Sequence, residues 1–341
     1  MTLPQNFIAR FKLKNLSSMA MTIWLMSTPL VLKGIDIDYS VVSVPEESGV
    51  ELTKITGKSD YVCMPQVIRR GQKLDWFSNR VLALIPGKEE IAYLSFRNNA
   101  TNIFIKDLLK QGGSRQRTNR MGVIDFSFSP NGKDLYFSET RGNTTSIFQT
   151  NATNGFVCRQ ITSGANDYSP VVDKQGKQVF FTRTENNGFG VWSYNLADKF
   201  LASYAQGLNP YPVLRSGETS LVVSRPSATG QSEIWKFNYE TGVEECLISD
   251  PAQSFTSPIV SPDGEWILFV GSSFLQGPGF VYPNTDLYVC RIDGTDLRQL
   301  THHAADDISP VWSNDGHYIY FVSQRGDAEG TANIWRMTFR Q

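Results

Sequence analysis

The side chains that could bind a metal ion come close together in one stretch of this sequence. Two of the three histidines, His302 and His303, lie just before the carboxylates Asp306 and Asp307. Imidazole and carboxylate groups are common metal ligands, but adjacent residues of a strand point to opposite sides. The third histidine, His317, follows an Asp-Gly turn and is expected at an exposed hairpin position. We therefore predict no metal site, no cofactor and no catalytic residue, and Ca²⁺ held by carboxylates alone is the alternative left open.

A second group of side chains consists of arginines that recur in step along the chain. Each lies at or just beyond the end of the second strand-like segment in a repeating unit. They are Arg97, Arg141, Arg183, Arg225 and Arg325. If the units are equivalent, five guanidinium groups gather on one face, where they would suit carboxylates, phosphates or an acidic protein surface. In the alternative interpretation, each arginine pairs with a nearby carboxylate or with loop carbonyl groups.

The cysteines show neither a metal-ligand spacing nor a pairing pattern. Cys63, Cys158, Cys246 and Cys290 fall in different repeats. Equivalent positions of repeats that are not neighbours lie beyond disulfide reach. We therefore expect four unpaired, half-buried thiols.

The unit that positions these residues is a hairpin, seen most clearly from Ser309 to Val322. A short apolar strand enters the Asp315-Gly316 turn, where glycine accepts a positive φ without a Cβ clash, and an aromatic-rich strand leaves it. The turn glycine recurs at intervals of roughly 41–52 residues, at Gly87, Gly132, Gly176, Gly217, Gly264 and Gly316. An aromatic residue of the following strand keeps the same step, at Phe104, Phe148, Trp192, Trp235, Tyr288 and Trp335.

Units of about 40–45 residues with four short strands are typical of β-propeller blades. We therefore predict an all-β fold over residues 49–341, a six-bladed β-propeller of four-stranded antiparallel blades. The last unit ends at Gln341 after its third strand, whereas residues 51–57 (ELTKITG) match the segments that close the other units. Because an open blade would leave an unpaired strand edge, residues 51–56 are predicted to pair with the strand that contains Trp335.

The segment before the repeats, residues 1–48, is interpreted as an export leader and linker. Arg10, Lys12 and Lys14 precede an apolar run from Met19 to Leu32. The run is shorter than the roughly 20 residues of a membrane-spanning helix, and its length suits the apolar region of a signal peptide. We therefore expect a periplasmic propeller. The alternatives are an uncleaved anchor formed by this run and a cytoplasmic propeller.

The overall composition argues against one class of partner. The formal net charge is −1, with 40% apolar, 19% charged and 12% aromatic residues. Nucleic acids are bound by a broad positive field, which this charge balance does not provide. We therefore expect no nucleic-acid partner.

Three of the turns carry a motif that resembles a known repeat. SPNG at 129–132, SPDG at 261–264 and SNDG at 313–316, the last preceded by ISPVW at 308–312, resemble the repeat of TolB-type propellers. That family includes TolB, the propeller domains of prolyl-oligopeptidase-like enzymes and many exported proteins of Gram-negative bacteria. The resemblance covers about residues 50–341 and implies a free-standing propeller, because residues 1–50 are too few for the α/β domain of TolB. The chain carries no G-x-S-x-G nucleophile elbow.

One connection departs from the repeat and is a candidate binding element. Residues 271–285 (GSSFLQGPGFVYPNT) lengthen the link between the second and third strands of the fifth unit, on the predicted face of the arginines. Phe274, Phe280 and Tyr282 on a loop stiffened by prolines would make good anchors for a partner. Alternatively, the loop folds over the channel mouth and plugs it.

Two function classes follow from these observations. The first is a binding or scaffold propeller of the cell envelope, a monomer that recognises a protein, peptide or glycan through loops on one face, with peripheral membrane association left open. The second is a hydrolase or lyase with its site in the central channel, and its activity either depends on a metal ion or does not. Because folds of this kind host many chemistries, the resemblance alone does not choose between them.

Overall fold

The computed structural model describes residues 51–64, 80–110, 112–185, 188–215, 217–228, 230–277, 280–326 and 331–340. The side chains of residues 185, 273–277 and 280–283 are not among those described. The predicted leader, residues 1–48, therefore lies outside the described residues. Within them, the single helical element is the 3-10 turn η2 (Lys58–Asp60), and no helix is long and apolar enough to span a membrane.

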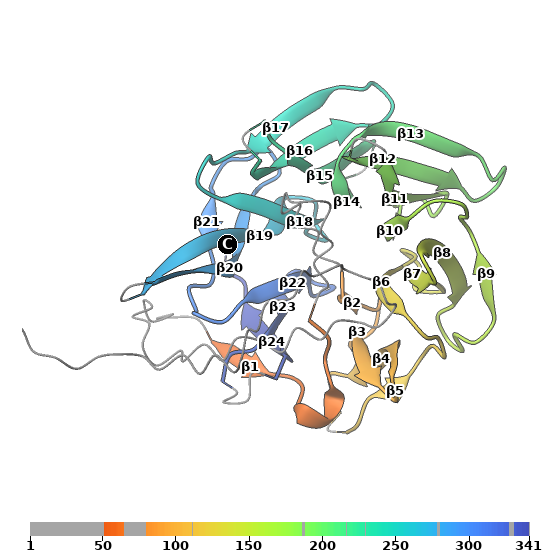
Figure 1. Ribbon diagram of the computed structural model, residues 1–341, viewed down its shortest axis with the longest axis horizontal. Helices are drawn as coiled ribbons and strands as arrows, with labels where there is room; N and C mark the ends of the chain where they lie inside the picture. The colour runs from red at the N-terminus through yellow and green to blue at the C-terminus, as the bar shows by residue number, and fades with distance from the viewer. Residues whose placement is uncertain are drawn as a thin grey trace, which may run out of the picture. The chain divides into compact units, whose positions relative to one another are not determined.

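Six four-stranded antiparallel sheets form the ring, which confirms the predicted fold class (Figure 1). The innermost strand of each sheet contacts the innermost strand of the next, and the last of them contacts the first. In ring order, the inner strands are β2 (Leu82–Leu84), β6 (Val123–Phe128), β10 (Asp167–Val172), β14 (Leu208–Pro212), β18 (Ser254–Val260) and β22 (Asp307–Trp312). We number the blades one to six in this order.

The other strands follow outward in each blade by antiparallel pairing. The second strands are β3 (Glu90–Arg97), β7 (Asp134–Arg141), β11 (Gln178–Glu185), β15 (Ser220–Pro226), β19 (Trp266–Gly277) and β23 (Tyr318–Ser323). The third strands are β4 (Ala100–Asp107), β8 (Thr144–Asn151), β12 (Gly188–Asn195), β16 (Ser232–Asn238), β20 (Phe280–Arg291) and β24 (Asn333–Thr338). The outer strands are β5 (Arg115–Gln116), β9 (Cys158–Gln160), β13 (Leu201–Gln206), β17 (Glu244–Ile248), β21 (Arg298–Gln299) and β1 (Leu52–Lys54).

The turn between the first two strands of a blade explains the motif SPNG, SPDG or SNDG of blades two, five and six. In blade six, Ser313 Oγ donates to Asp315 Oδ1 at 2.5 Å and accepts from the backbone N–H of Tyr318 at 2.8 Å. Gly316 has a φ of +74°, the left-handed conformation that residues with a Cβ avoid. The serine thus bridges the turn, the acid fixes the serine, and the glycine lets the chain reverse.

The recurring aromatic residues lie on the third strands, opposite buried residues of the second strands. Phe148 of β8 pairs with Phe137 of β7, and the two rings stack with their centroids 5.7 Å apart. Tyr288 and Phe269 do the same in blade five at 6.0 Å. Because each such pair fills the space between neighbouring sheets, the aromatic period in the sequence reports the packing of one blade on the next.

The ring closes as the sequence predicts. Strand β1 pairs antiparallel with β24, with Lys54 opposite Trp335. Beyond it, Ile55 N–H donates to the Ile334 carbonyl at 2.8 Å, and Ile334 N–H donates to Thr56 Oγ1 at 2.8 Å. The segment before the first blade therefore supplies the outer strand that blade six would otherwise lack.

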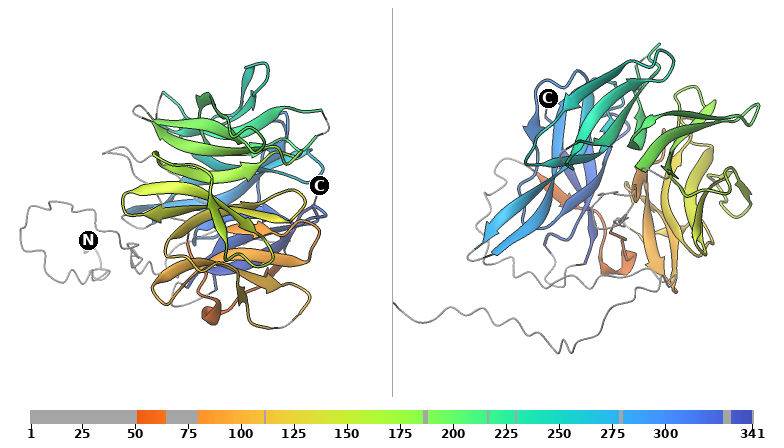
Figure 2. Two further views of the ribbon diagram at one scale, coloured as in Figure 1. Left: turned by 90° about the vertical axis from the view of Figure 1, so that its right-hand side faces the viewer. Right: turned by 45° about the horizontal axis from the view of Figure 1, so that its top comes forward.

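The predicted loop at residues 271–285 is instead part of a long hairpin. Strands β19 and β20 have 12 residues each and stay paired out to Gly277 opposite Phe280. In Figure 1 and Figure 2 this hairpin reaches beyond its blade. The prediction of a loop was wrong because pairing can continue between two extended segments as long as the reversal is left to the tip.

The four cysteines are free thiols, as predicted. Cys63 and Cys158 are partly buried, whereas Cys290 is buried and Cys246 is exposed. The expectation of half-buried thiols thus holds for two of the four.

Candidate functional site

All five predicted arginines lie at the ends of second strands, on the side of the ring where these strands give way to the third strands. We call this side the arginine face, and the opposite side, with the turns between the first and second strands, the turn face. Arg97 and Arg141 are the last residues of β3 and β7, Arg183 and Arg225 lie near the ends of β11 and β15, and Arg325 follows β23. Their use as a binding site remains a proposal, which depends on what each guanidinium already contacts.

Three of the five arginines hold a carboxylate of their own blade. Arg183 donates from Nε and Nη2 to Asp167 at 2.7 and 3.0 Å. Arg225 donates from both Nη atoms to Glu244 at 2.7 and 2.9 Å. Arg325 forms the same two-pronged pair with Asp307. In blades three and six the carboxylates are completely buried, and the Arg325 side chain is only 4% exposed.

Arg97 of blade one contacts a more elaborate acidic site. It donates to the Asp60 carbonyl at 2.9 Å, while the carboxylate of Asp60 accepts from Tyr93 at 2.9 Å and Ser114 at 2.7 Å, with Lys106 at 3.6 Å. Burial alone would raise the pKa of Asp60, but these hydrogen bonds, one from Gly57 N–H and the lysine charge outweigh it and hold the pKa below its ordinary value. Asp60 therefore acts as an anion that anchors η2 to blade one.

The same arginines cover the aromatic residues of the third strands. The guanidinium carbon lies 4.1 Å from the ring centroid of Phe104 for Arg97, and 4.5 Å from Trp192 for Arg183. Arg225 lies 4.6 Å from Trp235. A planar cation packed on an aromatic face while paired with a carboxylate is held in one rotamer. Arg97, Arg183 and Arg225 therefore stabilise the structure of the arginine face.

Blade two differs, because two guanidinium groups share one carboxylate. Arg120 donates from Nη2 to Glu139 at 2.6 Å, and Arg141 donates from Nε to the same oxygen at 3.0 Å. Both lie over the ring of Phe148, at 5.3 and 4.6 Å. The Arg141 side chain is 55% exposed. Blade two therefore presents one uncompensated positive charge to solvent.

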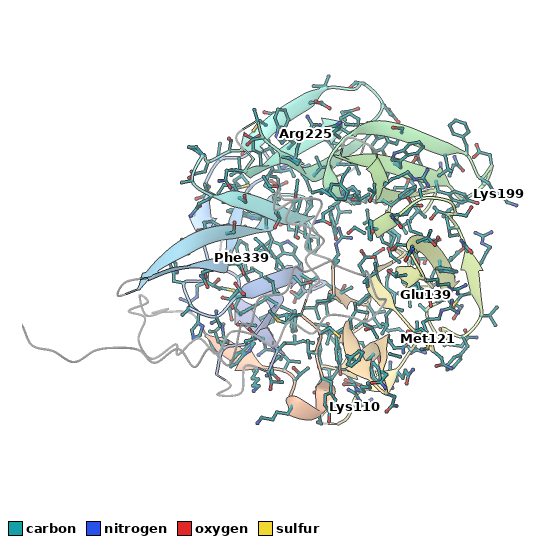
Figure 3. The ribbon with its side chains drawn as sticks, in the orientation of Figure 1. Lys110, Met121, Glu139, Lys199, Arg225 and Phe339 are labelled. Carbon is teal, nitrogen blue, oxygen red and sulfur yellow. The ribbon has the colours of Figure 1, made fainter. Side chains whose placement is uncertain are left out.

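Exposed apolar side chains lie beside this charge. Met121 is 76% exposed, and its neighbour Gly122 accepts a hydrogen bond from Thr140 N–H at 3.0 Å, directly before Arg141. Gly122 also bridges to Thr101 of blade one. Figure 3 labels Met121 and Glu139, which both belong to the part of the chain that forms blade two. Met121 and Arg141 thus lie together at the seam between the first two blades.

Tyr61 is a second exposed apolar residue, and it lies at the end of the second strand of blade one. Its side chain is 58% exposed, and its carbonyl accepts from Phe96 N–H at 3.2 Å. Its ring lies 5.7 Å from the guanidinium of Arg97. We call Met121 and Arg141 the blade 1–2 patch. Methionine and arginine are enriched where proteins bind proteins.

Inside the ring, polar side chains of the inner strands link neighbouring blades. Asp125 Oδ2 accepts from Ser169 N–H at 2.8 Å, and Ser169 Oγ donates to Asn209 Oδ1 at 2.8 Å. Asn209 Nδ2 donates to Ser257 Oγ at 3.4 Å. Ser169, Asn209 and Ser257 have φ values of +51°, +51° and +56°. In blades three, four and five this strained position of the inner strand holds a polar side chain that hydrogen-bonds to a neighbouring blade.

A buried arginine that was not predicted from the sequence reaches from blade one to blade four. Arg80, directly before β2, donates from Nη2 to the carbonyl of Pro210 on the opposite blade at 3.3 Å. Its Nη1, like Asp125 Oδ1, is buried without a hydrogen bond among the described residues. The equivalent position is held by Ile124, Tyr168, Leu208, Thr256 and Ile308 in the other five blades. An arginine at a repeat position that is uncharged in the other five blades was the signal that could have revealed it.

Burial raises the pKa of Asp125, and the hydrogen bond from Ser169 N–H with the charge of Arg80 offsets the rise only in part. Because the folded-state pKa lies above the unfolded value, near 3.9, stability is lost as the pH rises from about 4 through the folded pKa. Asp125→Asn should remove a slope of up to about 1.4 kcal/mol per pH unit from the unfolding free energy. Urea unfolding between pH 4.5 and 8 measures this, with exposed Asp198→Asn as the matched control. Equal slopes in both variants would contradict it.

The predicted candidates for a metal site are engaged separately. Asp306 Oδ1 accepts from Thr285 N–H at 3.0 Å and from its hydroxyl at 2.8 Å, and Asp307 pairs with Arg325. His303 Nδ1 accepts from Ala305 N–H at 2.9 Å. Among the residues that the structure describes, no three His, Cys, Asp or Glu side chains are grouped as metal ligands. The backbone at Phe274, Phe280 and Tyr282 belongs to the long hairpin, and their side chains lie outside the described ones.

Comparison with known proteins gives one sequence match and several structural ones. The sequence matches the TolB beta propeller domain over residues 78–278. A TolB-type protein from Agrobacterium tumefaciens is similar, with a TM-score of 0.56 and 15% identity, covering 77% of this chain and 91% of that one. TolB from Acinetobacter baumannii gives 0.57 and 17%, covering 75% and 66%. An oligogalacturonate lyase from Vibrio parahaemolyticus gives 0.55 and 10%, covering 88% and 96%. At these identities the structural likeness concerns the fold.

Proposed function

The chain belongs to the TolB beta-propeller family, and from this premise we propose that it is a binding propeller of the bacterial cell envelope. It recognises an acidic segment of a protein or peptide through the blade 1–2 patch. The observation that carries this proposal is the uncompensated Arg141, whose carboxylate partner Glu139 is shared with Arg120. The fold alone decides nothing here, since the similar structures include a lyase.

The chemistry of the patch supports a partner with a carboxylate beside an apolar side chain. A partner carboxylate would meet Arg141, which is already held over Phe148 and loses little freedom on binding. Met121 offers an adaptable apolar surface beside Arg141. Elsewhere on the arginine face, Arg183 and Arg325 are each paired with a buried carboxylate, which neutralises their positive charge.

The proposed location is the periplasm. The apolar run from Met19 to Leu32, with three basic residues before it, has the pattern of an export signal. Because the chain is proposed to lie in the periplasm, its partner is proposed to lie there as well.

A crosslinker that cannot pass the inner membrane tests partner and location together. In cells with a permeabilised outer membrane, it should join the wild-type chain to a partner. Arg141→Glu should lower this capture about tenfold, a loss of about 1.4 kcal/mol in binding free energy. Adding Met121→Ser to that variant should lower the capture further, because a few central contacts of an interface carry most of its binding energy. Lys133→Glu is the matched control, an equal charge reversal on the turn face of the same blade.

The outcomes separate the two parts of the proposal. A chain that the crosslinker never labels contradicts the periplasmic location. A labelled chain whose capture is the same for wild type and Arg141→Glu contradicts the patch. Thermal unfolding of each variant should match that of the wild type, because Glu139 keeps its bond to Arg120 in the variants.

The channel favours a second candidate, a hydrolase or lyase. Asp125 Oδ1 and Arg80 Nη1 are buried side-chain atoms without hydrogen-bond partners among the described residues, and the burial of Asp125 raises its pKa. Such groups are candidates for proton transfer and for anion stabilisation. Turnover of a peptide or an acidic oligosaccharide by the purified chain, lost in Asp125→Asn, would favour this candidate over a pure binding role.

A further inference from the structure

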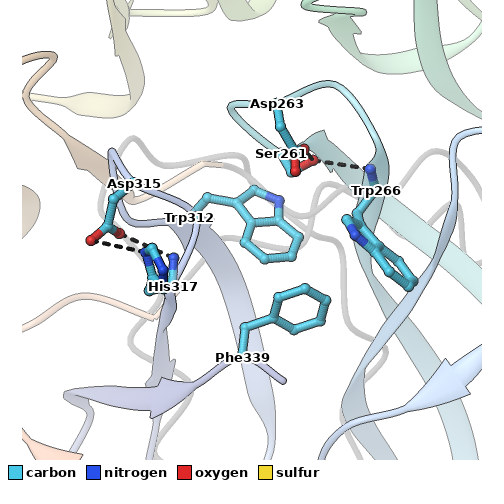
Figure 4. Close-up of a pocket in the computed structure, with 8 residues that line it drawn as sticks. Ser261, Asp263, Trp266, Trp312, Asp315, His317 and Phe339 are labelled. Carbon is cyan, nitrogen blue, oxygen red and sulfur yellow. Dashed lines mark hydrogen bonds and ion pairs between the residues drawn. The ribbon is translucent and has the colours of Figure 1, made fainter. Parts of the chain in front are cut away.

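A pocket of about 210 Å³ lies on the turn face, at the seam between blades five and six. Three aromatic residues, Trp266, Trp312 and Phe339, form its apolar walls (Figure 4). Asp263 and the Asp315–His317 pair complete the lining, from the S-x-D-G turns of the two blades. The pocket is on the opposite side of the ring from the blade 1–2 patch, so a ligand bound there is independent of the proposed function.

The aromatic walls are a departure from the repeat. Trp266 is the first residue of its second strand, a position that is polar in blades one to four, where it is held by Glu90, Asp134, Gln178 and Ser220. Phe339 follows the third strand of blade six, at a position where blade four has Tyr239 and the other blades have Leu108, Ala152, Leu196 and Ile292. Packing of the ring does not need these large side chains together, since those blades are built without them.

The three rings are fixed in place. Phe339 meets Trp266 edge to face at a centroid distance of 5.4 Å and Trp312 at 4.8 Å. Arg291 and Arg298 cover Trp266 at 3.9 and 4.8 Å. A wall held by rings at right angles and by two stacked guanidinium groups keeps its shape when a ligand enters.

One polar group in the wall lacks a partner. Trp312 Nε1 donates to the Ile259 carbonyl at 3.3 Å. Trp266 is 1% exposed, and its Nε1 has no acceptor among the described residues. A buried indole N–H without an acceptor costs free energy, which a ligand or water that brings an oxygen would recover.

The carboxylates of the pocket offer acceptors. Asp263 Oδ1 accepts from Ser261 Oγ at 2.5 Å and from Glu265 N–H at 3.0 Å, which leaves Oδ2 free of hydrogen bonds within the described part of the chain. Asp315 Oδ2 lies 3.2 Å from Nδ1 of His317, whose side chain is 76% exposed. A ligand that fits must therefore both accept from an indole N–H and donate to a carboxylate.

These requirements select one class of small molecule. An anion would be repelled by Asp263 and Asp315, and a cation would leave the Trp266 N–H unsatisfied beside Arg291 and Arg298. Hydroxyl groups accept and donate alike, and the C–H faces of a sugar ring suit aromatic walls. Ligand pockets for drug-sized molecules have volumes of about 300–1,000 Å³, so this smaller one suits a single ring. We propose that the pocket binds a neutral monosaccharide or the terminal sugar of a glycan.

Titration of the full chain with single neutral sugars tests the proposal. Glucose, galactose, mannose and N-acetylglucosamine are the probes, and tryptophan fluorescence and saturation-transfer NMR are the readouts. At least one sugar should bind with a millimolar dissociation constant. Trp266→Phe, which keeps an aromatic wall and removes the N–H, should weaken that binding by tenfold or more, and Asp263→Asn by a similar factor.

The matched control is Trp235→Phe, which removes an indole N–H on the arginine face. It should leave the dissociation constant unchanged. Denaturant unfolding of each variant checks the fold, so that a lost signal can be assigned to binding. Failure of all four sugars to bind the folded wild-type chain would overturn the proposal. Equal affinity of the wild type and a folded Trp266→Phe variant would also overturn it.

Discussion

Deletion of residues 1–58 is expected to abolish the cooperative unfolding of the propeller, whereas deletion of residues 1–50 is expected to leave it intact. The two truncations differ by β1 and the residues directly after it, which supply the outer strand of blade six. Without them, β24 presents an unpaired edge, and the contact that joins the two ends of the repeat array is lost.

The expected loss is a large fraction of the total stability. Strand β1 and its extension contribute backbone hydrogen bonds to β24, each worth about 1 kcal/mol net, and Thr56 adds one more. Leu52 and Ile55 pack partly buried against the core and add about 1 kcal/mol each. Together these amount to on the order of 4–6 kcal/mol, against 5–15 kcal/mol for a typical protein.

Urea denaturation followed by tryptophan fluorescence and circular dichroism measures both truncations. For the shorter deletion, the two probes should give one coincident transition. For the longer one, the midpoint should fall and the transitions should separate. If the two truncated chains unfold with the same midpoint and the same slope, β1 does not close the ring in solution.

The architecture could be predicted because repetition makes local signals reinforce one another. A single Asp315-Gly316 turn indicates one hairpin, but six turns in step with six aromatic residues fix a blade period. Closure followed from the same reasoning, since residues 51–57 resemble the closing segments of other units. Each of these signals depends on residues that are near one another in the chain.

The charge balance of the arginine face could not be predicted in this way. The carboxylates that hold the arginines come from different strands of each blade: Asp167 from the first, Glu139 from the second and Glu244 from the outermost. Sequence separation therefore gives no rule for the pairing. That Arg141 is exposed while Arg325 is buried depends on which neighbours fill the seam.

The seam between blades five and six illustrates the same limit. Trp266, Trp312 and Phe339 are far apart in sequence, and each alone looks like a core residue of its strand. Only the pairing of the two blades brings them around one space. The sequence does contain a signal, because Trp266 replaces a polar residue of the repeat, but the register of the strands is needed to see it.

Replacement of Arg325 by alanine is expected to destabilise the propeller by about 3–5 kcal/mol, because it leaves Asp307 completely buried without its cationic partner. Arg141→Ala should cost less than about 1 kcal/mol, since that side chain is largely exposed and Glu139 retains Arg120. Chemical denaturation of both variants provides the comparison. It decides which members of the arginine ring are structural and which are available to a partner.

A double-mutant cycle sharpens this test. If the loss in Arg325→Ala arises from an unpaired buried charge, then adding Asp307→Asn should recover part of it, with a coupling energy of about 2 kcal/mol or more. The Arg325 guanidinium also lies 5.1 Å from the ring of Phe321, and loss of that packing would remain in the double variant. Additive effects of the two changes, or equal losses for Arg325→Ala and Arg141→Ala, would contradict the division of the arginine face into paired residues that hold the blades and one exposed residue free to bind.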